Sequence, residues 1–378
     1  MKRVGCIVLL LVILAGALSF PGQAADLQTP GKSAVLMDVA TGTVLYESNP
    51  HERLAPASVT KIMTMLLIME AIDSGKISWD DMVTASEAAS AKGGSQIYLK
   101  VGETMAVSDM VKSIAVSSAN DCACAMAEHL AGSESAFVEQ MNQRAKELGM
   151  DDTHFVNCTG LDDDPAAQEH RTCAYDIALM SRELLKNHPD ITKFTTIWMD
   201  TVRNGAFGLS NTNKMVRFYS GCTGLKTGFT SGAGYCLSSS ARRDGLELIA
   251  VVMGAETSKD RFSACKSMLD YGFSLLKCAR ICDSDGLVYD IPVSGGSAET
   301  VRAATVGEFA VTVPKDSRVT ATVEARRFLW APVRQGDYVG KVQICVDGRA
   351  VTSLELFACE SCEEHGSVSI FDKIFGKN

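Results

Sequence analysis

The stretch 62–69 most constrains the fold, because almost every residue in it is apolar. A helix that is apolar on all sides must be buried on all sides, so we expect this one at the centre of a domain. Pro56 is tolerated in the first turn, and Asp73-Ser74-Gly75 supplies a stop signal. Ser58 and Lys61 then lie on one face at the start of the helix. That spacing gives a serine hydroxyl the neighbouring base it needs to act as a nucleophile.

The chain begins with the features of a secretory signal peptide. A basic start is followed by an apolar stretch over 4–18 and by small residues up to Ala25. We therefore expect residues 1–25 to be removed and the mature protein to work outside the cytoplasm, in the cell wall or on the outer face of the membrane. Loss of Lys2 and Arg3 takes the formal charge from -9 to -11. Because no basic run remains, we expect no nucleic-acid partner.

A change of pattern divides the mature chain into two predicted domains. Over 26–281, a β-hairpin, a helical cluster, strands from Gly221 onwards and a helix over 258–276 predict an α+β domain with a sheet flanked by helices. Over 282–365, short alternating strands separated by Gly, Pro and Asp predict a small all-β domain. The tail, 366–378, has an apolar face beside lysines, and we expect it either to touch a membrane surface or to pack on the protein.

The cysteines do not indicate a disulfide framework, although the sequence contains 13 of them and the protein is exported. Several lie inside apolar helix or strand patterns, where cysteine behaves as a small hydrophobic residue. Their oxidation state stays open. Cys359 and Cys362 form a C-x-x-C motif without a second pair. We therefore expect no metal site there or elsewhere.

Two further motifs follow Ser58 in a fixed order, Ser118-Ala119-Asn120 and Lys226-Thr227-Gly228. Together with S-x-x-K they match the signature of penicillin-binding proteins and class A β-lactamases. The chain resembles that superfamily and, within it, the serine-type D-alanyl-D-alanine carboxypeptidases of low molecular mass. The likeness extends over nearly the whole mature chain, including the trailing β-domain. Its clearest stretches are 56–61, 118–121, 224–228 and 233–235.

This resemblance implies a reaction on the stem pentapeptide of peptidoglycan and no cofactor. Ser58 would attack the carbonyl of the penultimate D-alanine and form an acyl-enzyme. Lys61 would be the base, with its pKa lowered by burial and by Lys226. Ser118 would relay a proton to the leaving amine. β-Lactam antibiotics would acylate the same serine and act as covalent inhibitors.

The resemblance also assigns the residues that hold the substrate. Asn120 would orient the substrate backbone, and Lys226 with Thr227 would bind the terminal carboxylate. Gly228 would let the substrate lie along the strand edge, and the backbone N–H groups of Ser58 and Phe229 would form the oxyanion hole. Further candidates are Thr230, for the carboxylate site, and Arg261, near the K-T-G strand. The loop Gly93-Gly94-Ser95 is expected to shape access to the site.

Three other functions share parts of this pattern. A β-lactamase shares the first steps, but no clear Glu-x-x-x-Asn loop that would activate the deacylating water is present in the 160s. Endopeptidase or transpeptidase action on cross-links uses the same motifs. A wall-binding scaffold with a silent site is the alternative from another class. His154 and His170 are expected to have surface or packing roles, because the mechanism already has its base.

Overall fold

The computed structural model describes residues 27, 29–163 and 165–365. The predicted signal peptide, 1–25, and the predicted tail, 366–378, lie outside the described residues. The described chain forms two compact units, one ending at Leu275 and the other beginning at Leu276. Within these ranges, no helix combines the length and the apolar character that a bilayer crossing requires.

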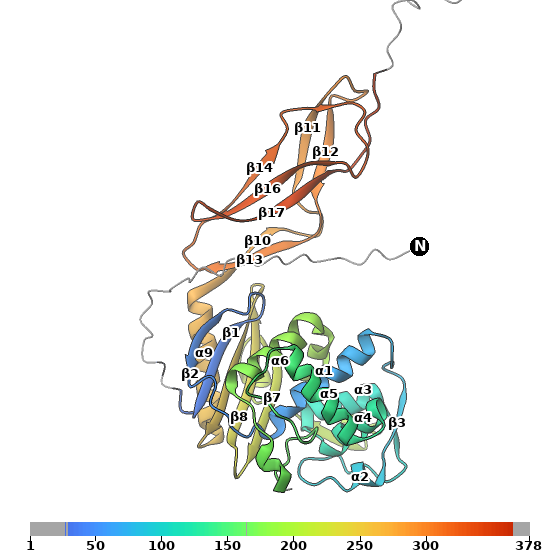
Figure 1. Ribbon diagram of the computed structural model, residues 1–378, viewed down its shortest axis with the longest axis vertical. Coiled ribbons are helices and arrows are strands. Elements are labelled where there is room, and N and C mark those ends of the chain that lie inside the picture. Colours follow the sequence, from blue (N-terminus) through green and yellow to red (C-terminus); the bar gives the residue numbers. More distant parts are fainter. Residues whose placement is uncertain (1–26, 28, 164, 366–378) are drawn as a thin grey trace, which may run out of the picture. The chain divides into compact units, whose positions relative to one another are not determined.

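The first unit is organised around an antiparallel sheet with helices on both faces (Figure 1). Its strand order is β2-β1-β9-β8-β7. The central strand β9 is buried almost throughout, as expected when both faces of a sheet are covered. The strands are β1 (Ser33–Asp38), β2 (Val44–Ser48), β7 (Cys222–Thr230), β8 (Gly234–Arg243) and β9 (Leu246–Ala255).

Two helices cover the faces of this sheet. On α9 (Ser258–Leu275), Gly272 lies so close to the sheet that an added Cβ would come within 2.5 Å of Leu248. On the other face, Ser181 of α6 (Ala174–Asn187) is 2.9 Å from Ser238 of β8, hydroxyl to hydroxyl. The Asp244-Gly245 turn that joins β8 to β9 has positive φ at both residues, as a tight hairpin turn requires.

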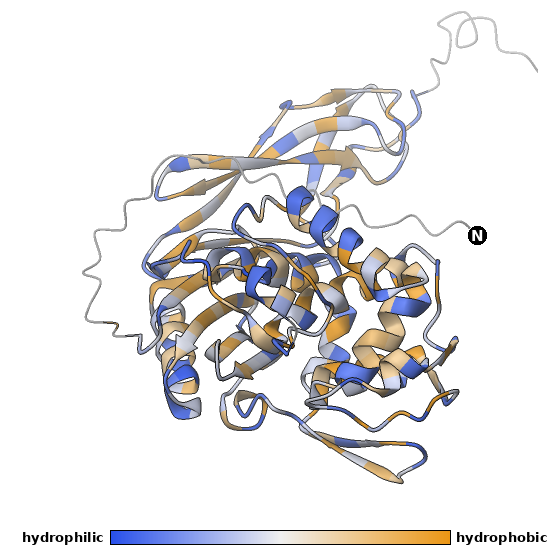
Figure 2. Cartoon of the chain, turned by 60° about the horizontal axis from the view of Figure 1, so that its bottom comes forward, coloured by the Kyte–Doolittle hydropathy of each residue, from blue (hydrophilic) through white to orange (hydrophobic). Residues whose placement is uncertain are grey.

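Beyond α6 lies a helical cluster whose centre is α1 (Lys61–Asp73). Most residues of α1 are fully buried, which confirms the helix predicted from the apolar run. Figure 2 shows hydrophobic residues along the helices of this cluster. The other helices and short strands here are α2 (Glu87–Ser90), α3 (Val107–Ser117), α4 (Asn120–Ala131), α5 (Glu134–Glu147), α7 (Thr192–Thr195), α8 (Met215–Phe218), β3 (Met82–Thr84), β4 (Thr104–Ala106), β5 (Met199–Val202) and β6 (Phe207–Ser210).

The segment that carries Ser58 differs from the predicted α-helical start. It is the 3₁₀ turn η1 (Ala57–Thr60), and α1 begins only at Lys61. Ala57 has φ +48°, a left-handed value that costs a residue with a Cβ about 1–3 kcal/mol and persists only where the surroundings impose it.

The second unit is an all-β domain, as predicted. A six-stranded sheet with the order β14-β16-β17-β12-β11-β15 surrounds a small apolar core that includes Val301, Val342 and Leu356. The unit begins with β10 at Leu276, ahead of the predicted boundary between 281 and 282, because β10 pairs with β13. Its strands are β10 (Leu276–Cys282), β11 (Val288–Ser294), β12 (Thr300–Thr305), β13 (Phe309–Pro314), β14 (Val319–Ala325), β15 (Leu329–Trp330), β16 (Tyr338–Val346) and β17 (Arg349–Ala358).

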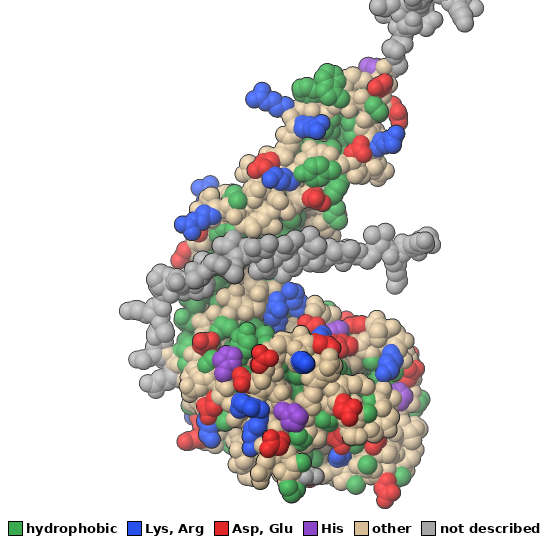
Figure 3. Space-filling view, in the orientation of Figure 1, with side chains coloured by type: hydrophobic (Ala, Val, Ile, Leu, Met, Phe, Trp, Pro, Cys, Tyr) green, Lys and Arg blue, Asp and Glu red, His purple; other side chains and the backbone are tan. Residues whose placement is uncertain are grey.

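On the face of the first unit seen in Figure 3, side chains of both charges are interspersed. The cysteines of the described chain are free thiols, and most are buried.

Candidate active site

Ser58 and Lys61 meet where η1 joins α1. The Lys61 amine lies 3.0 Å from the Ser58 hydroxyl oxygen and donates a hydrogen bond to the Thr159 carbonyl at 2.7 Å. Lys61 has no exposed surface. Burial lowers its pKa to about 7, against a smaller opposing effect of Cys158 and Asp121. An amine of that pKa is neutral in a large fraction of molecules at neutral pH, so it can accept the Ser58 proton.

Lys226 is the second buried lysine of the site. It lies on β7 with 1% of its surface exposed, and its amine donates to the Thr227 carbonyl at 2.8 Å. Burial lowers the pKa of Lys226 well below its usual range, and the charges of Lys61 and Arg261 add to this. The sequence predicted that burial and Lys226 together lower the pKa of Lys61. In the structure burial lowers the pKa of Lys61, and the repulsion between the two lysines lowers the pKa of Lys226. A bound carboxylate would favour the charged form of Lys226.

Ser118 and Asn120 form the third side of the site at the junction of α3 and α4. Ser118 ends α3 in a left-handed conformation with φ +63°, and it is 3% exposed. The Asn120 side-chain amide donates to the Gly93 carbonyl at 2.8 Å, and its backbone N–H donates to the Ser95 carbonyl at 2.7 Å. The predicted loop therefore lies against Asn120. Among the described residues, the buried Asn120 Oδ1 has no partner, so it is free to accept a hydrogen bond from a ligand.

Strand β7 passes directly against the Ser58 turn, and Gly228 is the point of closest approach. A Cβ added at Gly228 would lie 2.6 Å from the Pro56 carbonyl oxygen and 3.1 Å from the Ser58 nitrogen. Glycine is therefore needed here for the packing of the strand on the turn. Its predicted role in leaving room for the substrate along the strand edge stays a prediction. Thr227 donates to the Thr212 hydroxyl at 2.7 Å. Phe229 follows, 53% exposed and stacked on Tyr235.

Thr230 and Arg261 support this strand. The Thr230 hydroxyl accepts the Ala233 N–H at 3.1 Å and so caps the turn after β7. The Arg261 guanidinium donates to the Gly228 carbonyl at 2.8 Å and to the Cys236 carbonyl at 3.2 Å. Both residues therefore act on the backbone of β7, β8 and the turn between them, and their predicted place among the substrate-binding residues stays a prediction.

Two residues that were not predicted as site residues, Asp121 and Thr159, complete the site. Asp121 accepts the Ile97 and Leu99 N–H groups, at 3.1 and 3.0 Å for one of its oxygens, and so fixes the segment after the Gly93 loop. Thr159 receives the Lys61 hydrogen bond. Asp121 directly follows the S-x-N motif, a position that could have drawn attention to it. Thr159 carries no recognisable signal, because it acts through its backbone.

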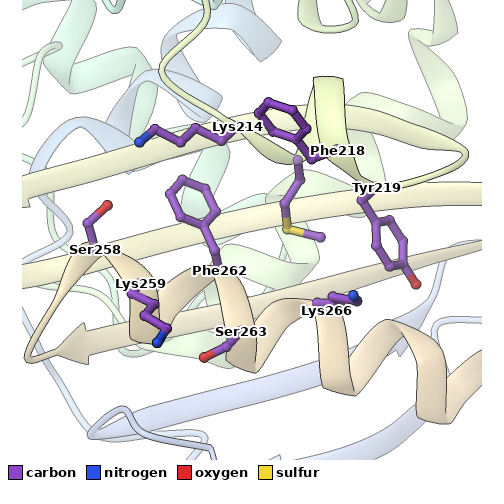
Figure 4. A pocket seen from close by; sticks show the side chains of 9 residues that line it. Lys214, Phe218, Tyr219, Ser258, Lys259, Phe262, Ser263 and Lys266 are labelled. Carbon is purple, nitrogen blue, oxygen red and sulfur yellow. The ribbon is translucent and has the colours of Figure 1, made fainter.

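A separate hollow of about 600 Å³ lies between α8 and α9 (Figure 4). Its apolar side chains include Met215 and Phe262, and Lys214 and Lys259 are among its charged residues. It contains none of the motif residues. The nucleophile and its base therefore lie outside this hollow.

A known protein family matches the part of the chain that contains Ser58, Ser118 and Lys226. The sequence profile described as D-alanyl-D-alanine carboxypeptidase, Peptidase S11, matches residues 21–257. This chain belongs to the D-alanyl-D-alanine carboxypeptidase family. A second profile, described as penicillin-binding protein 5, C-terminal domain, matches residues 280–364. The family, the fold class and the enzyme class predicted from the sequence are thereby confirmed.

Several relatives of this D-alanyl-D-alanine carboxypeptidase family member cover most of its length. It is 40% identical over 360 residues to the D-alanyl-D-alanine carboxypeptidase DacF of Bacillus subtilis, covering 94% of this chain and 91% of the relative. The crystal structure of penicillin-binding protein 5 from Haemophilus influenzae aligns with a TM-score of 0.67 at 31% identity, covering 89% of this chain and 98% of that one. Penicillin-binding protein D2 from Listeria monocytogenes, in an ampicillin-bound form, aligns at 33% identity with a TM-score of 0.60 and covers 66% of this chain and 99% of its own.

Proposed function

We propose that the protein is a serine D-alanyl-D-alanine carboxypeptidase that removes the terminal D-alanine from peptidoglycan stem pentapeptides through an acyl-enzyme on Ser58. One observation carries the proposal. The Ser58 hydroxyl contacts the amine of Lys61, and burial lowers the pKa of that amine to about 7. A nucleophile and a base of matched pKa are what acyl transfer at neutral pH requires.

The reaction begins when the Ser58 oxygen attacks the carbonyl of the penultimate D-alanine while Lys61 takes the hydroxyl proton. The negative charge that develops on the carbonyl oxygen is stabilised by the N–H groups of Ser58 and Phe229. Ser118 relays the proton from Lys61 to the leaving nitrogen, the C–N bond breaks, and D-alanine departs with Lys61 neutral again. Water then hydrolyses the ester and regenerates Ser58.

Two sides of the site bind the substrate, one formed by Asn120 and the other by Lys226 and Thr227. The unpartnered Asn120 Oδ1 accepts an N–H of the peptide backbone. Lys226 and Thr227 bind the terminal carboxylate, which offsets the low pKa that burial imposes on Lys226. Arg261 holds the Gly228 carbonyl and so keeps β7 in place beside the substrate.

The experiment uses the mature protein with diacetyl-L-Lys-D-Ala-D-Ala and with benzylpenicillin. The expected results are release of D-alanine and a stable penicilloyl adduct that peptide mapping locates on Ser58. Ser58→Ala, the matched control, should give neither. Absence of D-alanine release from the folded protein would overturn the proposal, and rapid turnover of penicillin would assign a β-lactamase instead.

The site of action is outside the cytoplasmic membrane, where the substrate polymer lies. The sequence of the tail supports contact with a membrane surface. Its apolar residues have the spacing of one helix face, with two lysines beside them: Ile370, Phe371, Ile374 and Phe375 beside Lys373 and Lys377. Flotation with anionic lipid vesicles, comparing the mature chain with one that ends at residue 365, tests this contact. Equal flotation of both would contradict it.

A further inference from the structure

The backbone just before the nucleophile is held in a conformation that it would not adopt alone. Ala57 has φ +48°, although it carries a Cβ. Its carbonyl oxygen and the Ser58 N–H belong to one planar peptide unit, so the direction of one fixes the direction of the other. Whatever holds the Ala57 carbonyl therefore aims the Ser58 N–H, the proposed donor to the oxyanion.

A chain of three hydrogen bonds runs from the Val156 N–H through His170 and Thr60 to this carbonyl. The Thr60 hydroxyl donates to the Ala57 carbonyl at 2.8 Å. The His170 Nε2 lies 2.8 Å from the same hydroxyl, and the Val156 N–H donates to His170 Nδ1 at 3.2 Å. Because a backbone N–H can only donate, Nδ1 accepts, and a neutral imidazole then carries its proton on Nε2. His170 donates to Thr60, and Thr60 donates to Ala57.

We propose that His170 is a positioning residue for acylation, acting through Thr60 on the Ala57–Ser58 peptide and so aiming the oxyanion-stabilising N–H. This inference rests on the proposed function. His170 touches neither Ser58 nor Lys61 by any hydrogen bond of the described chain, so its effect passes through Thr60. Gly160 confines the Ala57 carbonyl from another direction, since a Cβ at position 160 would lie 1.8 Å from the carbonyl oxygen.

The surroundings keep His170 in the neutral form that this chain needs. Burial, followed by the nearby groups His154, Arg171 and Lys61, lowers the pKa of His170 to about 3. A protonated ring would also direct a second N–H at the Val156 N–H. The hydrogen bonds from His170 through Thr60 to Ala57 therefore stay the same over the pH range in which Lys61 titrates. Loss of His170 should lower the acylation rate constant without changing the pH midpoint of its pH dependence.

Two uncharged substitutions separate positioning from packing. Glutamine can place an amide N–H near the position of Nε2, whereas asparagine reaches only as far as Nδ1. We expect His170→Asn to lower the first-order rate constant for acylation by fluorescent penicillin about 10–100-fold, with the noncovalent dissociation constant and the pH midpoint unchanged. His170→Gln should stay within about threefold of wild type, as should the control His154→Gln.

A second pair of variants keeps the test decisive if a histidine variant does not fold. Thr60→Val removes the hydroxyl at nearly constant shape, and Thr60→Ser keeps it. Thr60→Val should lower the acylation rate constant by as much as His170→Asn does. The double variant should lower it no further than either single variant, because both substitutions break the same series of hydrogen bonds. Wild-type rates in His170→Asn or Thr60→Val would overturn the inference, as would equal losses in the Asn and Gln variants. Failure of the wild type itself to be acylated would instead overturn the proposed function.

Discussion

At the scale of single residues, the state of Lys61 decides when Ser58 can react. Burial favours the uncharged amine and lowers the pKa of Lys61 to about 7. Only the neutral amine can take the Ser58 proton, so activity belongs to the pH range above this value. Below it the protonated lysine still donates to the Thr159 carbonyl but offers no lone pair to the serine.

We therefore expect acylation by fluorescent penicillin to rise with pH and to level off above about pH 7. Below that pH the second-order rate constant should fall about tenfold per pH unit, because the fraction of neutral Lys61 falls in that proportion. Stopped-flow measurements between pH 5 and 9 provide the test. A rate that is constant over this range, or that decreases as pH rises through 7, would contradict the assignment of Lys61 as base.

The sequence predicted the motif residues of the site because their spacing and order are recognisable along the chain. It could not predict the role of His170, which lies 110 positions from Thr60 and reaches it only through the fold. The sequence did favour a packing role for His170, and its burial agrees with that. The packing role of Gly228 could not be predicted either, since it depends on how closely β7 approaches η1.

At the scale of elements, the contact between β7 and the Ser58 turn sets the width of the site. Gly228→Ala would place a methyl group 2.6 Å from the Pro56 carbonyl oxygen. Neither backbone can move aside freely, because Arg261 holds β7 and Thr60 holds the turn. We expect a loss of stability of about 1–3 kcal/mol from overpacking.

The same change should lower the acylation rate constant about 100-fold or more, because it displaces the oxyanion-hole donors from one another. Gly232→Ala is the matched control, since a Cβ there meets nothing closer than 3.4 Å, the Asp162 carboxylate. It should behave like wild type in thermal denaturation and in acylation. If Gly228→Ala retained wild-type acylation, β7 and η1 could not be in the close contact described.

Long elements with clear periodicity were predicted well, and short ones were not. The hairpin of β1 and β2, the helix α9 and the strands β7 to β9 follow patterns that their sequences display. The 3₁₀ turn η1 was predicted as α-helix, because its conformation is imposed by Thr60, His170 and Gly160 rather than by local preference. The pairs β3–β4 and β5–β6 have only three or four residues in each strand, too few for alternation to show.

At the scale of the whole molecule, the two units have separate apolar cores. The core of the first unit draws on residues between Val35 and Met253, and that of the second on residues between Ile291 and Cys362. A unit with its own core can fold alone. The residues assigned to the reaction, from Ser58 to Arg261, belong to the first unit.

We therefore expect a chain that ends at Leu275 to fold and to hydrolyse diacetyl-L-Lys-D-Ala-D-Ala with a kcat/KM within about threefold of the full mature protein. The Listeria structure supports this, since 66% of this chain aligns with 99% of the Listeria chain in its ampicillin-bound form. Circular dichroism and D-alanine release provide the measurements, with the truncated Ser58→Ala variant as the inactive control. If the truncated chain folded but lost hydrolysis of this soluble peptide, the second unit would have to take part in the reaction, and the site could not be confined to the first unit.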